Sequence, residues 1–142
     1  MAYCTIDDLE DQISEDELIM LTDDAAAGVV DTDIAAAAIA KSDALIDGYC
    51  GKRYGVPFTT VPDVIKQFSA DIAIYNLFGR REGAPEDRRT RYKDAIDFLK
   101  GVARGDNSLG ENDPDGSPAD TNAPQISSST RIFSRTKLMS GF

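Results

Sequence analysis

The sequence predicts an all-α fold: a small helical bundle of two short N-terminal helices and three longer ones, followed by an extended C-terminal arm. Apolar residues recur at spacings of three and four as far as about residue 103, which places them on one face of a helix. Residues that favour helix N-termini precede these stretches, and glycine or proline follows most of them. The chain has 142 residues, a length typical of one domain.

Both short helices are expected within the first 22 residues. Thr5 can cap the first, because its hydroxyl can accept a hydrogen bond from a free backbone N–H of the first turn. Ser14 and Glu17 have the spacing of a capping box and predict the start of the second helix. The expected core contacts of these two helices are Ile6, Leu9, Ile13, Leu18 and Leu21.

Three longer helices are expected over residues 33–50, 62–78 and 86–103. Thr32 is the expected cap of the first, and Pro62 fits the first turn of the second. Each helix has an apolar stripe, and packing these stripes together would form one core. The stripes are Ile34, Ala38, Leu45 and Tyr49, with Ile39, Ser42 and Ile46 beside them; Ile65, Phe68, Ile72, Tyr75 and Phe78; and Tyr92, Ile96, Leu99 and Val102.

The composition changes after the last predicted helix, which divides the chain into three parts. Residues 1–105 hold the predicted helices, and residues 106–125 are a polar linker with too little apolar area to form a core. Residues 126–142 combine apolar and basic side chains, which fits a docking arm. The alternative is that this segment packs on its own domain as a strand or hook. The arm residues expected to bind a partner are Arg131, Ile132, Phe133, Arg135, Leu138, Met139 and Phe142.

Charge is distributed unevenly along the chain, whose net charge is −10. Residues 1–50 carry thirteen acidic residues and one lysine, whereas residues 51–105 carry eleven basic and seven acidic residues. The acidic part repels phosphate, which disfavours nucleic-acid binding there. A basic patch could instead contact the acidic part of another copy; the alternatives are a solvated helix face and, for Arg53, the seam between two long helices. The candidates for this subunit interface are Arg53, Arg88, Arg89 and Arg91.

The composition argues against an enzyme. The chain has no histidine, which excludes histidine-based catalytic triads and zinc sites. Cys4 and Cys50 are too few for a cysteine-rich metal site and are expected to be free, buried thiols. We expect no catalytic residue, metal or cofactor. We also expect no secretory leader and no membrane span, since no apolar run approaches the roughly 20 residues that a span requires.

Several short motifs together resemble one protein family. The central motifs are Ile46-Asp-Gly-Tyr49, Lys52-Arg53-Tyr54-Gly-Val-Pro57 and Asp71-Ile-Ala-Ile-Tyr75-Asn-Leu77. In this order they resemble the head-to-tail connector, or adaptor, proteins of tailed bacteriophages. The opening Met1-Ala-Tyr-Cys-Thr-Ile-Asp-Asp-Leu9 and the closing stretch from Arg131 to Phe142 resemble the branch found in Mu-like phages and prophages. The resemblance covers nearly the whole chain apart from the linker.

This resemblance implies a structural protein of the virion neck, assembled in the host cytoplasm. It implies a homo-oligomeric ring of about twelve copies, joined by heterologous contacts, that binds the portal protein and a tail terminator or stopper protein. Double-stranded DNA would pass through the lumen without sequence-specific binding, and the arm would reach the portal. The acidic residues expected to face this channel are Glu10, Asp11, Glu15, Asp16 and Glu17. The alternative is a small acidic protein-binding module, such as an inhibitor that mimics DNA.

Overall fold

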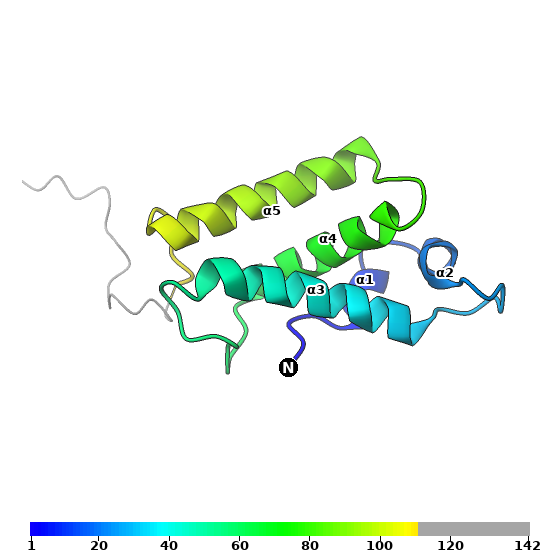
Figure 1. Ribbon diagram of the computed structural model, residues 1–142, viewed down its shortest axis with the longest axis horizontal. Coiled ribbons are helices and arrows are strands. Elements are labelled where there is room, and N and C mark those ends of the chain that lie inside the picture. The colour runs from blue at the N-terminus through cyan, green and yellow to red at the C-terminus, as the bar shows by residue number, and fades with distance from the viewer. Residues whose placement is uncertain (111–142) are drawn as a thin grey trace, which may run out of the picture.

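The structure is a computed structural model that describes residues 1–110. Within this range the chain forms five helices and no strand, which confirms the all-α prediction (Figure 1). The helices are α1 (Ile6–Glu10), α2 (Glu15–Thr22), α3 (Thr32–Cys50), α4 (Asp63–Gly79) and α5 (Glu86–Arg104). The expected arm and most of the expected linker lie outside the described residues.

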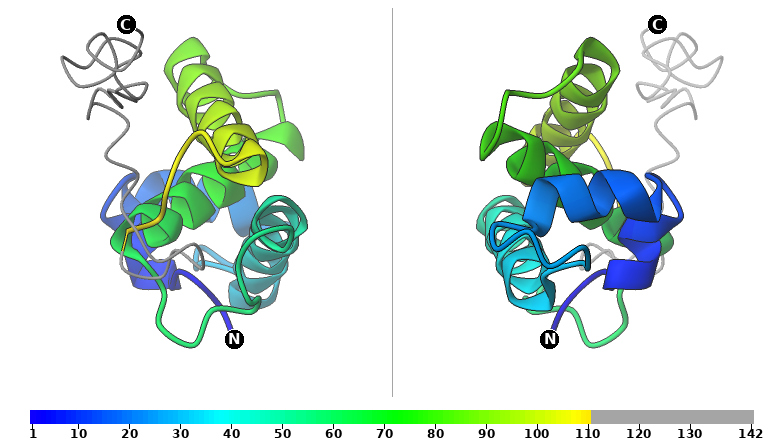
Figure 2. Two further views of the ribbon diagram at one scale, coloured as in Figure 1. Left: turned by 90° about the vertical axis from the view of Figure 1, so that its left-hand side faces the viewer. Right: turned by 90° about the vertical axis from the view of Figure 1, so that its right-hand side faces the viewer.

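The central element of the bundle is α4, which contacts each of the other four helices. The long helices α3 and α5 pack against α4 and also touch one another. The two short helices contact both α3 and α4, and they lie at the end of the bundle where α3 begins (Figure 2). The acidic short helices are therefore attached to one end of the long-helix bundle, where their polar side chains can meet those of α4 and α5.

The expected core of α4 is only partly right. Ile65 and Ile72 are fully buried as expected, but so are Ile74 and Leu77, which the expected stripe left out. Because four helices surround α4, it buries more than one face, and a single stripe cannot describe it. The outer members of the expected stripe, Phe68, Tyr75 and Phe78, are half-buried.

The cores of α3 and α5 are shifted around each helix relative to the expectation. The buried residues of α3 are Ala35, Ala38, Ile39, Ser42, Asp43, Ile46 and Cys50. Those of α5 are Ala95, Leu99, Gly101 and Val102. Several residues expected at the centre of these stripes are instead half-buried at the edge of the core, namely Ile34, Leu45, Tyr49, Tyr92 and Ile96.

The helix starts follow the capping chemistry, with one correction. Thr5 caps α1 in a full capping box, in which its hydroxyl accepts from the Asp8 N–H and the Asp8 carboxylate accepts from the Thr5 N–H. Ser14 caps α2 through its hydroxyl, which accepts from the Glu17 N–H, but the reciprocal half of the expected capping box is not formed. The cap of α3 is Asp31 rather than Thr32, because the Asp31 carboxylate reaches two N–H groups of the first turn, at 3.0 and 3.2 Å. Thr32 is the first helical residue.

The packed domain continues beyond the end of α5. Gly105 adopts a left-handed conformation, with φ of 90°, and the following N–H of Asp106 donates to the Gly101 carbonyl at 2.8 Å. This is the usual way in which a glycine ends a helix and turns the chain back. Leu109 is then buried, and its N–H donates to the Tyr54 hydroxyl at 3.0 Å. The first residues of the expected linker therefore contact the helical domain.

Both cysteines, Cys4 and Cys50, are free and buried, as expected. Burial raises the pKa of each thiol to about 11. Each thiol therefore stays protonated at neutral pH and serves as a small apolar group. Among the described residues, no helix is long and apolar enough to cross a membrane.

Candidate functional site

The most exposed charged surface on the short helices is acidic. Four carboxylates, those of Glu10, Asp11, Glu15 and Asp16, are exposed along α1, α2 and the turn between them. Glu17 is half-buried, and its N–H is used to cap α2. None of these five forms an ion pair with another residue of the range 1–110. This acidic surface, defined by the four exposed residues, therefore keeps its charge.

Other acids in the first part of the chain bind cations of α4 and the turn after it. The Lys66 ammonium lies 3.0 Å from the Asp8 carboxylate. Burial alone would raise the pKa of Asp8, but hydrogen bonds from Thr5 and Lys66 outweigh it and lower that pKa overall. Arg80 and Arg81 each approach the Asp24 carboxylate to 2.6 Å. These contacts fasten the acidic part of the chain to the central helix.

Two of the four arginines expected at a subunit interface, Arg88 and Arg91, bind polar side chains of their own subunit. Arg88 donates to the Gln12 carbonyl at 2.9 Å and to the Gln12 side chain at 3.1 Å, which ties α5 to the turn between α1 and α2. Arg91 lies 3.7 Å from the carboxylate of Asp71, a buried residue of α4. These contacts within one chain account for both residues without a second copy.

The other two arginines differ in their surroundings. Arg53 is half-buried, with its guanidinium carbon 5.9 Å from the centre of the Tyr54 ring, and it also lies beside Gly105. Arg53 therefore contacts residues of its own subunit, next to the end of α5. Arg89 is exposed on α5 and makes no ion pair with the described residues. Arg89 is therefore the member of the set that is available to a partner.

A polar network holds the N-terminal segment on α3 and α4. Asp43 accepts hydrogen bonds from the Tyr3 N–H at 3.0 Å and from the Ser69 hydroxyl at 2.6 Å. The Tyr3 hydroxyl donates to Asp47 and accepts from the Phe58 N–H at 3.2 Å. Burial, followed by the hydrogen bond to Asp47, raises the pKa of Tyr3 to about 12, so this hydroxyl remains a donor at neutral pH.

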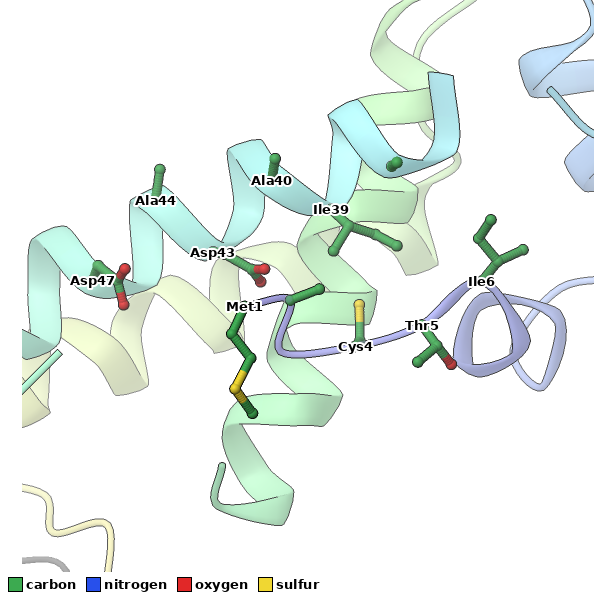
Figure 3. Close-up of a pocket in the computed structure, with 11 residues that line it drawn as sticks. Met1, Cys4, Thr5, Ile6, Ile39, Ala40, Asp43, Ala44 and Asp47 are labelled. Carbon is green, nitrogen blue, oxygen red and sulfur yellow. The ribbon is translucent and has the colours of Figure 1, made fainter. Parts of the chain in front are cut away.

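Beside this network lies an open groove of about 540 Å³ between residues 1–6 and α3, which we call the α3 groove (Figure 3). Its α3 wall carries the exposed residues Ala36, Ala40 and Ala44, which are spaced by one helical turn. Asp43 and Asp47 also line it. No cluster of three or more metal-ligating side chains occurs within residues 1–110. The α3 groove can therefore accommodate apolar side chains next to carboxylates.

Comparison with known proteins identifies the family of this chain. The model of the family described as Bacteriophage Mu, Gp36 matches residues 3–128. The chain belongs to this family. Gene product J of Escherichia phage Mu is 32% identical over 138 residues, which cover 95% of this chain and 96% of that protein. The Mu-like prophage FluMu protein gp36 of Haemophilus influenzae is 38% identical over 90 residues, which cover 63% of this chain and 62% of that protein.

The expected resemblance to a Mu-like phage protein is therefore confirmed. The match to the Mu Gp36 family covers all five helices and ends near the start of the expected arm. The expected arm residues, from Arg131 to Phe142, lie outside the described residues.

Several charged and polar contacts of this Mu Gp36 family member could not be found from the sequence. The sequence alone indicates no partner for Lys66, Asp71, Arg80 or Arg81. Their partners lie far away in the sequence, as with Arg80 and Asp24, which are 56 residues apart. The helical spacing of Ala36, Ala40 and Ala44 was a visible signal of an exposed small-residue face, but nothing in the sequence placed the N-terminal segment beside it.

Proposed function

We propose that this Mu-like phage protein is a structural head-to-tail connector. In this proposal about twelve copies form a ring by repeating one heterologous contact. The ring binds the portal of the phage head on one side and a tail terminator or stopper protein on the other, and it extends the channel for DNA. The observation that carries the proposal is the exposed acidic surface of α1 and α2, whose carboxylates have no cationic partner within residues 1–110.

An acidic channel wall suits the passage of DNA. Tight binding to DNA depends on lysine and arginine side chains that neutralise phosphates and release counterions. The acidic surface offers no such cations, so DNA could slide past it without being held. Several cations that could have neutralised this part of the chain are already used within the subunit, by Asp8, Asp24 and Gln12.

The partner-binding part of the proposal rests on the expected arm. Residues 126–142 combine large apolar side chains with three cations, and they follow a polar linker. We assign this arm to the portal, because an apolar segment on a long tether can fill grooves on a neighbouring protein. Arg89, which is exposed on α5, is the residue that we assign to the contact between ring subunits.

The experiment that tests this function is to mix the purified full-length protein with portal rings and to image the product by electron microscopy. A second sample carries Phe133→Ser and Leu138→Ser in the arm, which should leave the described bundle intact. A ring added to the portal by the parent chain and not by the variant would support the proposal. A protein that does not bind the portal at any concentration tested would contradict it.

A second candidate function is favoured by the same acidic surface. A small acidic protein can inhibit a DNA-binding protein by presenting carboxylates where DNA would present phosphates. Such a mimic would act as a monomer or dimer, and the arm substitutions would leave its binding unchanged. Binding to the portal therefore separates the two candidates.

A further inference from the structure

The α3 groove presents an accessible helix surface lined by small side chains. Ala36, Ala40 and Ala44 are exposed and line it along two turns of α3, and an alanine side chain ends at Cβ. Large side chains of a binding segment can therefore approach the backbone of α3 closely. The groove volume of about 540 Å³ lies in the range of pockets that hold several apolar groups. Figure 3 shows the N-terminal segment running beside α3, with the Cys4 side chain directed towards Ile39.

The same groove carries negative charge that the bundle does not neutralise. Asp43 and Asp47 line it, and the hydrogen bonds that they accept come from neutral donors, Tyr3 and Ser69. Neither carboxylate forms an ion pair with a residue of the range 1–110. A ligand that combines apolar side chains with cations would complement both properties of the groove.

The last twelve residues of this chain have that combination. Residues 131–142 contain three cations and five large apolar residues, and no acidic residue. Every other stretch of comparable length with three or more cations also contains acidic residues, as α5 does. The closing segment is therefore the part of the chain whose chemistry complements the α3 groove.

The described chain ends close to the groove. The Leu109 N–H donates to the Tyr54 hydroxyl at 3.0 Å, and the Tyr54 ring lies 6.2 Å from the Phe58 ring. The Phe58 ring lies 5.6 Å from the ring of Tyr3, whose hydroxyl reaches Asp47 at the groove. Twenty residues separate position 110 from Arg131. An unstructured chain of this length spans roughly 25 Å, which is enough to return to the groove of the same molecule.

We propose that the α3 groove is a docking site for residues 131–142 of the same chain. The apolar side chains of this segment fill the space beside Ala36, Ala40 and Ala44, and its cations lie near Asp43 and Asp47. Because the segment is tethered, its effective concentration at the groove is high and docking needs only modest affinity. This docking does not depend on the connector function. If that function holds, the portal and the α3 groove compete for one segment, so the arm is free to bind elsewhere only after it leaves the groove.

The test uses tryptophan fluorescence of the full-length protein, because the chain contains no tryptophan. The reporter is the single substitution Phe133→Trp. We expect its emission to be blue-shifted relative to a free tryptophan peptide and to be protected from acrylamide quenching. Adding Ala40→Arg, or separately Ala44→Arg, places a long cation in the groove, and either should shift the emission to the red and restore quenching.

The matched control is Ala37→Arg, which makes the same change at an exposed position of α3 that does not line the groove. This control should leave the blue shift unchanged, and circular dichroism should show equal helix content in all variants. The proposal would be overturned if the blue shift persisted in Ala40→Arg and Ala44→Arg. It would also be overturned if the Phe133→Trp reporter alone showed the emission of a solvent-exposed tryptophan. A blue shift that disappears on dilution would also overturn it, because a second copy would then occupy the groove. The measurement needs no portal, so a failure of the connector function would leave its result unaffected.

Discussion

Arg91 of α5 and Asp71 of α4 form an ion pair in which only the carboxylate is buried. The Arg91 Nη1 atom lies 3.7 Å from Oδ1 of Asp71, and the two side chains are 52% and 5% exposed. This Asp71 oxygen has no hydrogen-bond partner among the described residues. The free energy that a carboxylate loses when it leaves water can exceed the free energy that it gains from a partly exposed cation. Burial therefore raises the pKa of Asp71, although Arg91 and Arg88 oppose this effect.

The raised pKa of Asp71 predicts an unusual pH dependence. The folded state binds the Asp71 proton more tightly than the unfolded chain does. The contribution of Asp71 to the free energy of unfolding therefore falls as the pH rises from the ordinary aspartate pKa through the raised pKa. Asp71→Asn removes the charge, and we expect this variant to be more stable than the parent at pH 7. Its advantage should shrink on acidification and vanish below the ordinary aspartate pKa of 3.8. Urea unfolding across this pH range measures the difference.

The control for Asp71 is Asp97→Asn, which changes an exposed carboxylate of α5 in the same way. This control should differ little from the parent at any pH. An Asp71→Asn protein that is less stable than the parent at pH 7 would show that the Arg91 ion pair outweighs the burial of the carboxylate.

A second prediction concerns the two arginines that share Asp24. Asp24→Ala removes the ion pairs to Arg80 and Arg81. The side chains of these three residues are between 35 and 49% exposed. Exposed pairs contribute at most about 1 kcal/mol each, so we expect the free energy of unfolding to fall by roughly 1 kcal/mol. The loss should be smaller in 1 M salt, which screens exposed charges. Asp16→Ala, which removes an exposed and unpaired acid, should show no such loss when both are unfolded in urea.

A third prediction separates the two possible caps of α3. Asp31→Ala should lower the free energy of unfolding by about 1 kcal/mol, because two N–H groups of the first turn lose their acceptor. Thr32→Ala should change it far less, since Thr32 is already helical and exposed. Equal losses in thermal or urea unfolding would contradict the assignment of Asp31 as the cap.

The helices themselves could be predicted because their signals are local. The number, order and approximate bounds of all five helices follow from apolar spacing and from caps such as Thr5 and Ser14. Local signals do not say how many neighbours a helix has. The expected core lacked Ile74 and Leu77 because no local pattern indicates that four helices surround α4.

The charged contacts could not be predicted for a related reason. Arg88 looked free for a subunit interface because its partner, Gln12, lies 76 residues away in the sequence. The exposure of Glu10, Asp11, Glu15 and Asp16 was easier to anticipate, since these residues fall between the apolar positions of two amphipathic helices. The exposed face of a short helix can thus be predicted from the sequence alone, whereas long-range polar partners require the three-dimensional arrangement.

The central position of α4 predicts where replacing a side chain by alanine destabilises the bundle most. Ile72 is fully buried in α4, and Ile72→Ala should lower the free energy of unfolding by about 2–5 kcal/mol. Phe68 is half-buried, so part of its side chain is already hydrated, and Phe68→Ala should cost less. Urea unfolding of the two variants provides the comparison, and a larger loss for Phe68→Ala would mean that the edge of the core between α4 and α5 matters more than its centre.

The last prediction concerns the acidic surface and rests on the connector function. Changing Glu10, Asp11, Glu15 and Asp16 together to lysine would place four cations per subunit where the proposed channel runs. These cations could bind phosphates, and each such contact releases counterions, so DNA should be held more tightly at low salt than at high salt. We expect phage particles that carry this variant to eject DNA more slowly, with the rate partly restored by added salt.

The control for this experiment reverses the charge of Asp87 and Asp94, two exposed acids of α5 outside the acidic surface. Particles with this change should eject DNA at the parent rate if only α1 and α2 face the channel. Ejection measured by release of a DNA-binding dye signal distinguishes the outcomes. An unchanged rate in the α1–α2 variant would place the acidic surface away from DNA, whereas equal slowing in both variants would mean that the overall charge of the subunit, rather than one surface, determines the effect.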